Sequence, residues 1–201
     1  HLGFEGARAL QDVLGRHAII AISGGSTMAA VAQQLPPKHL EPVVIPARGG
    51  VGDVVEQQAN VIASVIAERL FGTYKMLHLP DGLSEESLKM LVTMEPQIKE
   101  INELAHKANV LMFGIGDAMQ MVEKRRMTQE QKRFLTMHRA VGEALGQYCN
   151  IKGDIVYSVN NIGITLDTLE HVDHVLAVAG GAHKAQAIIA VMRASKKGIL
   201  I

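Results

Sequence analysis

The chain has 201 residues, a mass of 21.7 kDa and a formal net charge of zero, with 20 Lys and Arg against 20 Asp and Glu. A neutral chain of this length is one large or two small domains, and it lacks the basic excess of most nucleic-acid-binding modules. The single cysteine, Cys149, excludes an internal disulfide framework and is typical of a reducing cytosol, so we expect a cytoplasmic protein.

The sequence shows no segment for membrane insertion or secretion. No apolar run reaches the ~18 residues that span a bilayer, so we expect no membrane contact. The start of the chain lacks the basic head and apolar core of a signal peptide. A helical pattern begins almost at His1, and we therefore expect a fragment of a longer protein.

The first half of the chain alternates apolar runs of strand length with amphipathic segments. The spacing of apolar residues predicts helices over 4–15, 27–35 and 53–70, and strands over 17–22, 43–45 and 74–79. Asp53 is a suitable N-cap for the third helix, and Gly72 is a suitable C-terminal stop.

The second half continues this alternation. The same spacing predicts helices from Ser84, over 95–107, after Asp117, over 128–145 and over 182–194, and strands over 109–113, 155–159, 174–179 and 199–201. Repeated strand–helix alternation implies crossover connections and a mostly parallel sheet. The expected fold class is therefore α/β, a doubly wound sheet with helices on both faces, in one domain over residues 1–201.

Glycine-rich loops follow four of the predicted strands. They contain the pairs Gly24-Gly25, Gly49-Gly50 and Gly180-Gly181, and the segment 114–116. Ligands of open α/β sheets bind outside the carboxyl ends of the strands, and glycine lets backbone amides approach an anion closely. These loops predict a small anionic ligand, most simply a phosphorylated one, although tight turns also require glycine.

The first loop carries two hydroxyl groups. Backbone amides of Gly24 and Gly25, together with the hydroxyls of Ser26 and Thr27, could surround a phosphate. The alternative is that Ser26 or Thr27 only caps the following helix. The segment is not a Walker loop, because the lysine and the spacing are absent.

Cationic side chains accompany these loops. Arg48 precedes a glycine pair and could hold a phosphate through two parallel hydrogen bonds. Lys184 falls in the first turn of a predicted helix, where its charge opposes the helix dipole unless an anion is bound. Arg125 and Arg126, next to Lys124, could hold a second phosphate or contact a partner subunit. A solvated surface position is the alternative for each cation.

Two further polar residues could hydrogen-bond sugar hydroxyls. Gln58 falls one turn into the helix predicted over 53–70, and Glu143 falls late in the helix predicted over 128–145. For both, an ordinary structural position is the more common case.

Five segments in this order resemble the effector-binding domain of SorC-type bacterial transcriptional repressors. They are Ser-Gly-Gly-Ser-Thr at 23–27, Ala-Arg-Gly-Gly-Val-Gly at 47–52, Gln-Gln-Ala-Asn at 57–60, Gly-Ile-Gly-Asp at 114–117 and Ala-Gly-Gly-Ala-His-Lys at 179–184. The resemblance covers nearly the whole chain. It implies a Rossmann-like fold of the sugar-phosphate-isomerase type and a phosphorylated sugar as effector, with fructose 1,6-bisphosphate the inducer of the glycolytic member.

The resemblance also implies partners and residue roles. A separate N-terminal helix-turn-helix domain, absent from residues 1–201, would bind operator DNA, and the protein would be a homo-oligomer, a dimer or a tetramer. The implied ligand contacts are Gly24, Gly25, Ser26, Thr27 and Lys184 for one phosphate, Arg48 and Gln58 elsewhere on the ligand, Arg125 and Arg126 for a second phosphate, and Glu143 for a sugar hydroxyl.

A phosphosugar isomerase or deaminase is the alternative, because the fold hosts such enzymes too. An isomerase needs a carboxylate base, and the candidates are Asp81, Asp117 and Glu143. Asp81 is more typical of a turn and Asp117 of a helix cap. We therefore expect a sensor rather than an enzyme, without a cofactor. We also expect no metal, because no Cys or carboxylate completes a ligand set with His171 and His174.

Overall fold

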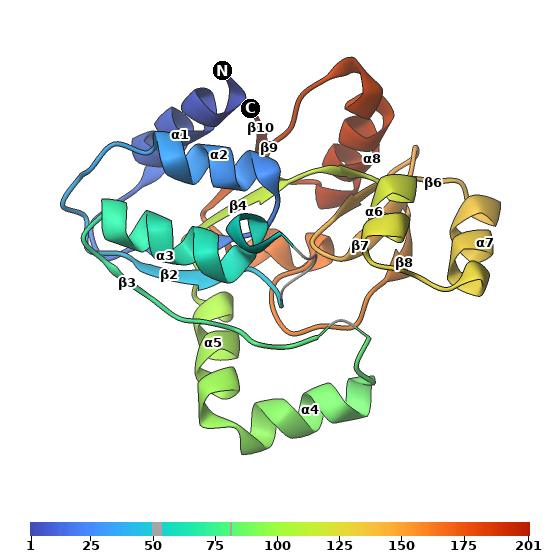
Figure 1. Cartoon of the computed structure of the whole chain (residues 1–201), viewed down its shortest axis with the longest axis horizontal. Coiled ribbons are helices and arrows are strands. Elements are labelled where there is room, and N and C mark those ends of the chain that lie inside the picture. Colours follow the sequence, from blue (N-terminus) through green and yellow to red (C-terminus); the bar gives the residue numbers. More distant parts are fainter. Residues whose placement is uncertain (50–53, 81) are drawn as a thin grey trace.

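The computed structural model describes residues 1–49, 54–80 and 82–201, and it confirms the α/β class (Figure 1). A six-stranded sheet with the order β10-β9-β4-β1-β2-β3 forms its centre, and all its neighbouring strands are parallel. These strands are β1 (Ile19–Ile22), β2 (Val43–Pro46), β3 (Thr73–Tyr74), β4 (Val110–Gly114), β9 (His174–Val178) and β10 (Ile199–Leu200).

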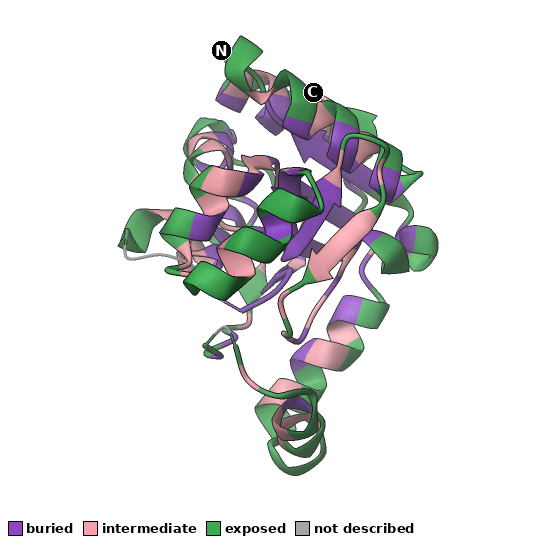
Figure 2. Cartoon of the chain, turned by 90° about the vertical axis from the view of Figure 1, so that its right-hand side faces the viewer, coloured by how far each residue is buried: buried purple, intermediate pink, exposed green. Residues whose placement is uncertain are grey.

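Helices cover both faces of this sheet. One face packs against α1 (Leu2–Val13), α2 (Ser26–Gln34) and α3 (Ala59–Arg69), and the other against α5 (Pro96–His106) and α8 (Ala185–Ser195). Figure 2 shows the buried strands between helices whose outer faces are exposed. Successive side chains of a strand point to opposite faces, so Ile20 and Ile22 join one apolar cluster and Ala21 joins the other. This double burial explains why the strands are continuous apolar runs.

The structure also contains a second, antiparallel sheet that the sequence did not predict. Its order is β5-β6-β7-β8, and its strands are β5 (Gly116–Asp117), β6 (Ala140–Ala144), β7 (Gln147–Asn150) and β8 (Ile155–Ser158). The strand predicted over 155–159 therefore exists, but it belongs to this sheet and not to the parallel one.

The predicted helix over 128–145 is wrong in its second half. Helix α7 (Gln129–Met137) ends at the C-cap His138, and Arg139 then has a φ of +53°. Strand β6 pairs with β7 across a two-residue turn, in which Leu145 and Gly146 have φ values of +52° and +82°. Positive φ at both turn residues suits the right-handed twist of a hairpin. Glu143 consequently lies on a strand, not on a helix.

Three other predicted boundaries move. The short helix η1 (Val55–Gln57) precedes α3, so Gln58 is the N-cap of α3 and not a residue inside it. The predicted cap Asp53 lies outside the described residues. The strand over 74–79 shortens to β3, because the backbone of Leu77 hydrogen-bonds the buried Asn60 side chain instead of a neighbouring strand. The helix over 182–194 begins with η3 (Ala182–Lys184).

The remaining helices lie at the edges of the molecule. The α4 helix (Glu85–Met94), capped by Ser84, and α5 project together from the body (Figures 1 and 2). They enclose a small apolar cluster of their own around Leu77, Leu88 and Ile101. Helix α6 (Ala118–Lys124) follows β5, and η2 (Leu166–His171) precedes β9. None of the helices in residues 1–49, 54–80 and 82–201 has the length and hydropathy needed to cross a membrane.

Candidate functional site

The loops after β1, β2 and β4 converge on one cavity of about 230 Å³. This volume is smaller than the roughly 300–1,000 Å³ of pockets for drug-sized molecules, so the cavity suits a compact ligand. Helix α6, the β6–β7 turn and η3 complete its wall. Eight of the ten predicted site residues line it: Gly24, Gly25, Ser26, Thr27, Arg48, Arg125, Glu143 and Lys184.

The other two predicted residues lie outside this wall. Gln58 stands behind the first glycine loop, where the N–H of Gly25 donates to the carbonyl of Gln57 at 2.8 Å. Arg126, which has a φ of +51°, lines a neighbouring hollow beside Gln131 and Tyr157.

The wall also contains residues that the sequence reading did not assign to the site. Gln120, Met121 and Lys124 of α6 line the cavity. Gln120 and Lys124 are four residues apart and therefore share one face of the helix. Of the basic run 124–126, Lys124 and Arg125 line the cavity, whereas Arg126 does not. The cap of α6 carries the relevant signal, because Asp117 fixes where the helix begins.

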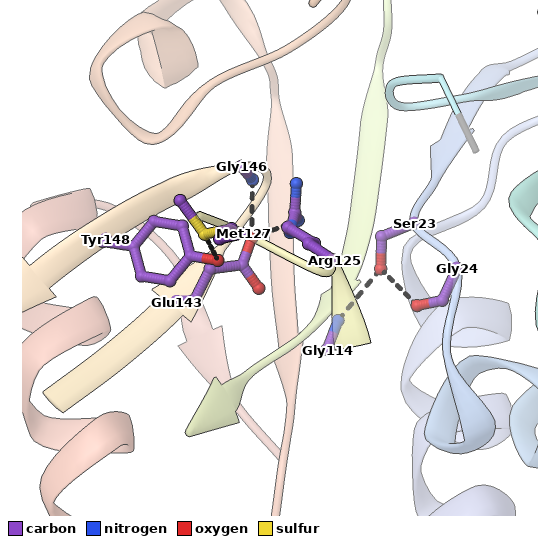
Figure 3. A network of polar contacts seen from close by, with 8 residues as sticks. All are labelled: Ser23, Gly24, Gly114, Arg125, Met127, Glu143, Gly146 and Tyr148. Carbon is purple, nitrogen blue, oxygen red and sulfur yellow. Dashed lines mark hydrogen bonds and ion pairs between the residues drawn. The ribbon is translucent and has the colours of Figure 1, made fainter. Parts of the chain in front are cut away.

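The first glycine loop presents the start of α2 to the cavity. Its N-cap is Gly25, with a φ of +116°, and no side chain of the described residues caps it, so neither Ser26 nor Thr27 has the capping role considered above. The first-turn amides of a helix are unsatisfied within the helix, and they attract anions. The Ser23 hydroxyl accepts from the Gly114 N–H at 3.1 Å and lies 3.2 Å from the Gly24 carbonyl, to which it donates (Figure 3). Ser23 therefore ties the loop after β1 to the end of β4.

The charges around the cavity are unequal. Among the described lining residues, the cations are Arg48, Lys124, Arg125 and Lys184, against the single carboxylate Glu143. Lys184 is held in place, because its Nζ donates to the carbonyl of Ile115 at 3.0 Å. A concave surface with such an excess of positive charge attracts anions.

A buried ion pair forms part of the wall. Glu143 Oε1 accepts from Arg125 Nη2 at 2.8 Å and from the N–H of Gly146 at 2.7 Å (Figure 3). The side chains of Arg125 and Glu143 are only 4% and 6% exposed, so their pairing offsets part of the cost of burying two charges.

The carboxylates considered for an isomerase base have structural roles where they are described. Asp117 caps α6, with Oδ1 accepting from the amides of Met119 and Gln120. Glu143 is engaged by Arg125 and Gly146, and Asp81 lies outside the described residues. In the described parts of the chain, no three His, Cys, Asp or Glu side chains are grouped so that they could hold a metal ion.

Cys149 is buried on β7, where it pairs with Gly142, the neighbour of Glu143 on β6. Burial, and to a smaller extent the negative charge of Glu143, raise the pKa of its thiol to about 12. We expect the folded protein to resist a thiol-specific disulfide reagent at pH 8 and the denatured chain to react with one equivalent, because only the thiolate attacks.

The same shift predicts a pH dependence of stability. From about pH 9 the unfolded chain loses the thiol proton while the folded protein keeps it up to about pH 12, so the free energy of unfolding falls as the pH rises through this window. Rapid labelling of the folded protein at pH 8, in the experiment with the thiol reagent, would contradict the burial of Cys149.

Comparison with known proteins gives consistent results. The family model "Putative sugar-binding domain" matches residues 1–201. Two proteins named central glycolytic genes regulator, from Priestia megaterium and Bacillus subtilis, are 42% and 37% identical to it over 193 and 185 residues. The matches cover 95% and 91% of this chain but 56% and 54% of those proteins, so the chain spans about half the length of these relatives.

Solved structures extend the comparison to the fold. A protein from Enterococcus faecalis, described as belonging to the SorC family of transcriptional regulators, has a TM-score of 0.87 and 34% identity, and the match covers 100% of this chain and 84% of that one. The full-length sorbitol operon regulator SorC from Klebsiella pneumoniae has a TM-score of 0.86 at 18% identity, covering 100% of this chain and 67% of that one. The similarity to the Klebsiella pneumoniae structure concerns the fold alone, because the identity is only 18%.

Proposed function

Because this chain belongs to the family of sugar-binding domains of SorC-type transcriptional regulators, we propose that it is the effector-sensing domain of a repressor and that its effector is a phosphorylated sugar. One observation carries the proposal. The uncapped start of α2 opens into a cavity in which four cations face one carboxylate among the described lining residues. Such an excess of positive charge beside the start of a helix matches an anionic ligand better than a neutral sugar.

The geometry suggests how the ligand contacts are divided. The amides and hydroxyls of residues 24–27 bind one phosphate together with Lys184. Arg48, Arg125 and Lys124 bind the second anionic group, and Glu143 accepts from a sugar hydroxyl while it holds Arg125. Contacts from Gln58 and Arg126 stay predictions, which alanine variants at these positions test.

Fructose 1,6-bisphosphate is the effector that we propose. Two relatives of this chain are named for the regulation of central glycolytic genes, and a doubly phosphorylated sugar offers charge to both groups of cations.

The remainder of the protein belongs to the same proposal. A preceding helix-turn-helix domain would bind operator DNA, and the whole protein would be a cytoplasmic homo-oligomer. Linkage then requires that an effector which weakens operator binding must itself bind the operator-bound protein less tightly.

Thermal unfolding with a panel of sugars tests the proposal. The panel contains fructose 1,6-bisphosphate, fructose 6-phosphate, glucose 6-phosphate, triose phosphates and unphosphorylated fructose. A ligand present at 100 times its dissociation constant stabilises a protein by about 2.7 kcal/mol, which is an easily measured shift. We expect fructose 1,6-bisphosphate to give the largest shift and unphosphorylated fructose none.

The sugars are recovered and analysed after the measurement. Stabilisation with unaltered sugar supports the sensor. A converted sugar would instead support the isomerase or deaminase alternative, and stabilisation by none of the phosphorylated sugars would contradict the anion site itself.

A further inference from the structure

We propose that Gly146 is a positioning residue for the effector, because this one residue sets the places of both buried guanidinium groups of the cavity, those of Arg48 and Arg125. The inference rests on the proposed function, since it assumes that these two arginines contact a phosphorylated sugar. It adds a determinant that contacts no ligand and acts only through its neighbours.

The backbone of Gly146 controls Arg125 through one carboxylate oxygen. The N–H of Gly146 donates to Glu143 Oε1 at 2.7 Å, and the same oxygen accepts from Arg125 Nη2 at 2.8 Å (Figure 3). The side chains of Arg125 and Glu143 are 4% and 6% exposed, so this ion pair is largely withdrawn from solvent. A displacement of the Gly146 amide therefore moves Glu143, and Arg125 with it.

The missing side chain of Gly146 controls Arg48. A Cβ atom at this position would lie 3.0 Å from Arg48 Cζ and 3.1 Å from Nε and Nη2, which is closer than carbon normally approaches these atoms. Arg48 is only 6% exposed and lines the cavity, so a guanidinium displaced by such a Cβ atom would change its place in the binding site. The guanidinium group of Arg48 can lie against the turn because glycine has no Cβ atom that would occupy the same space.

The turn itself is well fixed. Leu145 and Gly146 have φ values of +52° and +82°, and the flanking pair Ala144 and Gln147 is in register in the antiparallel sheet. Leu145 also lines the cavity. The same turn therefore fixes the positions of both arginines. The distance between the two guanidinium groups sets which spacing of anionic groups the cavity accepts.

The variant Gly146→Ala tests this role, with Gly82→Ala as a matched control. Gly82 has a similar φ of +87°, but apart from its chain neighbours no atom of the described residues would lie within 4 Å of a Cβ atom there. The two variants therefore share the backbone strain and differ in the steric effect on Arg48. Calorimetry with fructose 1,6-bisphosphate is expected to show about tenfold weaker binding for Gly146→Ala and no loss for Gly82→Ala. A tenfold effect is typical of the coupling between two residues that touch each other, here residue 146 and Arg48.

A double-mutant cycle separates positioning from general damage. In an Arg48→Ala background, Gly146→Ala should weaken binding far less than it does in the wild type, because its main steric target is gone. If Gly146→Ala fails to fold, the double variant should recover the fold for the same reason. Equal losses in both backgrounds, equal losses for the two glycine variants, or no recovery of the fold would each overturn the inference.

A measurement without ligand tests the positioning role of Gly146 independently of the proposed function. The Nε–H resonance of Arg48 in an NMR spectrum should move in Gly146→Ala and stay in place in Gly82→Ala. If wild-type protein binds none of the phosphorylated sugars, the proposed function fails, while this resonance still decides whether Gly146 positions Arg48.

Discussion

Glu143→Ala should lower the free energy of unfolding by about 3–5 kcal/mol, because the substitution removes a buried carboxylate that is paired with the buried guanidinium of Arg125. Arg125 and Glu143 are 4% and 6% exposed, and the Gly146 N–H loses its acceptor at the same time. Chemical denaturation of the wild type and the variant measures the difference. Glu143→Gln keeps an oxygen acceptor for Gly146 and should lose less.

An exposed ion pair supplies the control for this variant. Glu85 pairs with Lys89 on the surface of α4, with both side chains about three-quarters exposed at 75% and 74%, so Glu85→Ala should leave stability nearly unchanged. Fructose 1,6-bisphosphate should stabilise Glu143→Ala less than the wild type, since the variant lacks the proposed contact to a sugar hydroxyl and the carboxylate that holds Arg125. A loss no larger than that of Glu85→Ala would show that the pair is solvated in solution.

Lys184→Met should weaken the binding of fructose 1,6-bisphosphate by about 10- to 150-fold, because a hydrogen bond to a charged group contributes roughly 1.5–3 kcal/mol. Methionine retains most of the length of the side chain and removes the charge. Lys184 Nζ is fixed on the carbonyl of Ile115 at the end of β4, which places it beside the first glycine loop. Titration calorimetry at constant ionic strength measures the change.

Lys107→Met is the matched control for this loss. Lys107 is exposed at the end of α5 and is not among the residues that line the cavity, so its loss should not change the affinity. A Lys184→Met affinity within twofold of the control would remove Lys184 from the phosphate site.

The parallel sheet was predictable because burial on both faces leaves a simple signature. The segments around Ile20, Val44 and Leu111 are apolar at every position, and each ends at a glycine or a polar turn. The antiparallel sheet leaves a weaker trace. Its strand over residues 140–144 reads Ala-Val-Gly-Glu-Ala, which extends the amphipathic pattern of α7 without a visible break. Residues 140–144 form a strand because they pair with β7. Such pairing depends on residues elsewhere in the chain and cannot be read from the local sequence.

The site residues, too, were predictable where they follow the parallel strands and less so where they belong to the antiparallel sheet or to α6. The loops after β1, β2 and β4 converge because the strands are parallel, so their glycines and Arg48 could be grouped before the structure was known. The choice among Lys124, Arg125 and Arg126 depends on where α6 ends. Lys124 is its last residue and Arg125 its C-cap, and the chain leaves the helix at Arg126, which has a φ of +51°. The role of Glu143 depended on a hairpin that was not foreseen.

The edges of the parallel sheet also bear on how copies of this domain can associate. Its two outer strands, β3 and β10, have only two residues each. Lys75 directly follows the first, and Lys196 stands close before the second. Short edges flanked by lysine offer little free backbone to an incoming strand, which guards a protein against edge-to-edge aggregation. Any assembly of this domain with further copies is therefore expected to use the side chains of helices and loops rather than a continuation of the sheet.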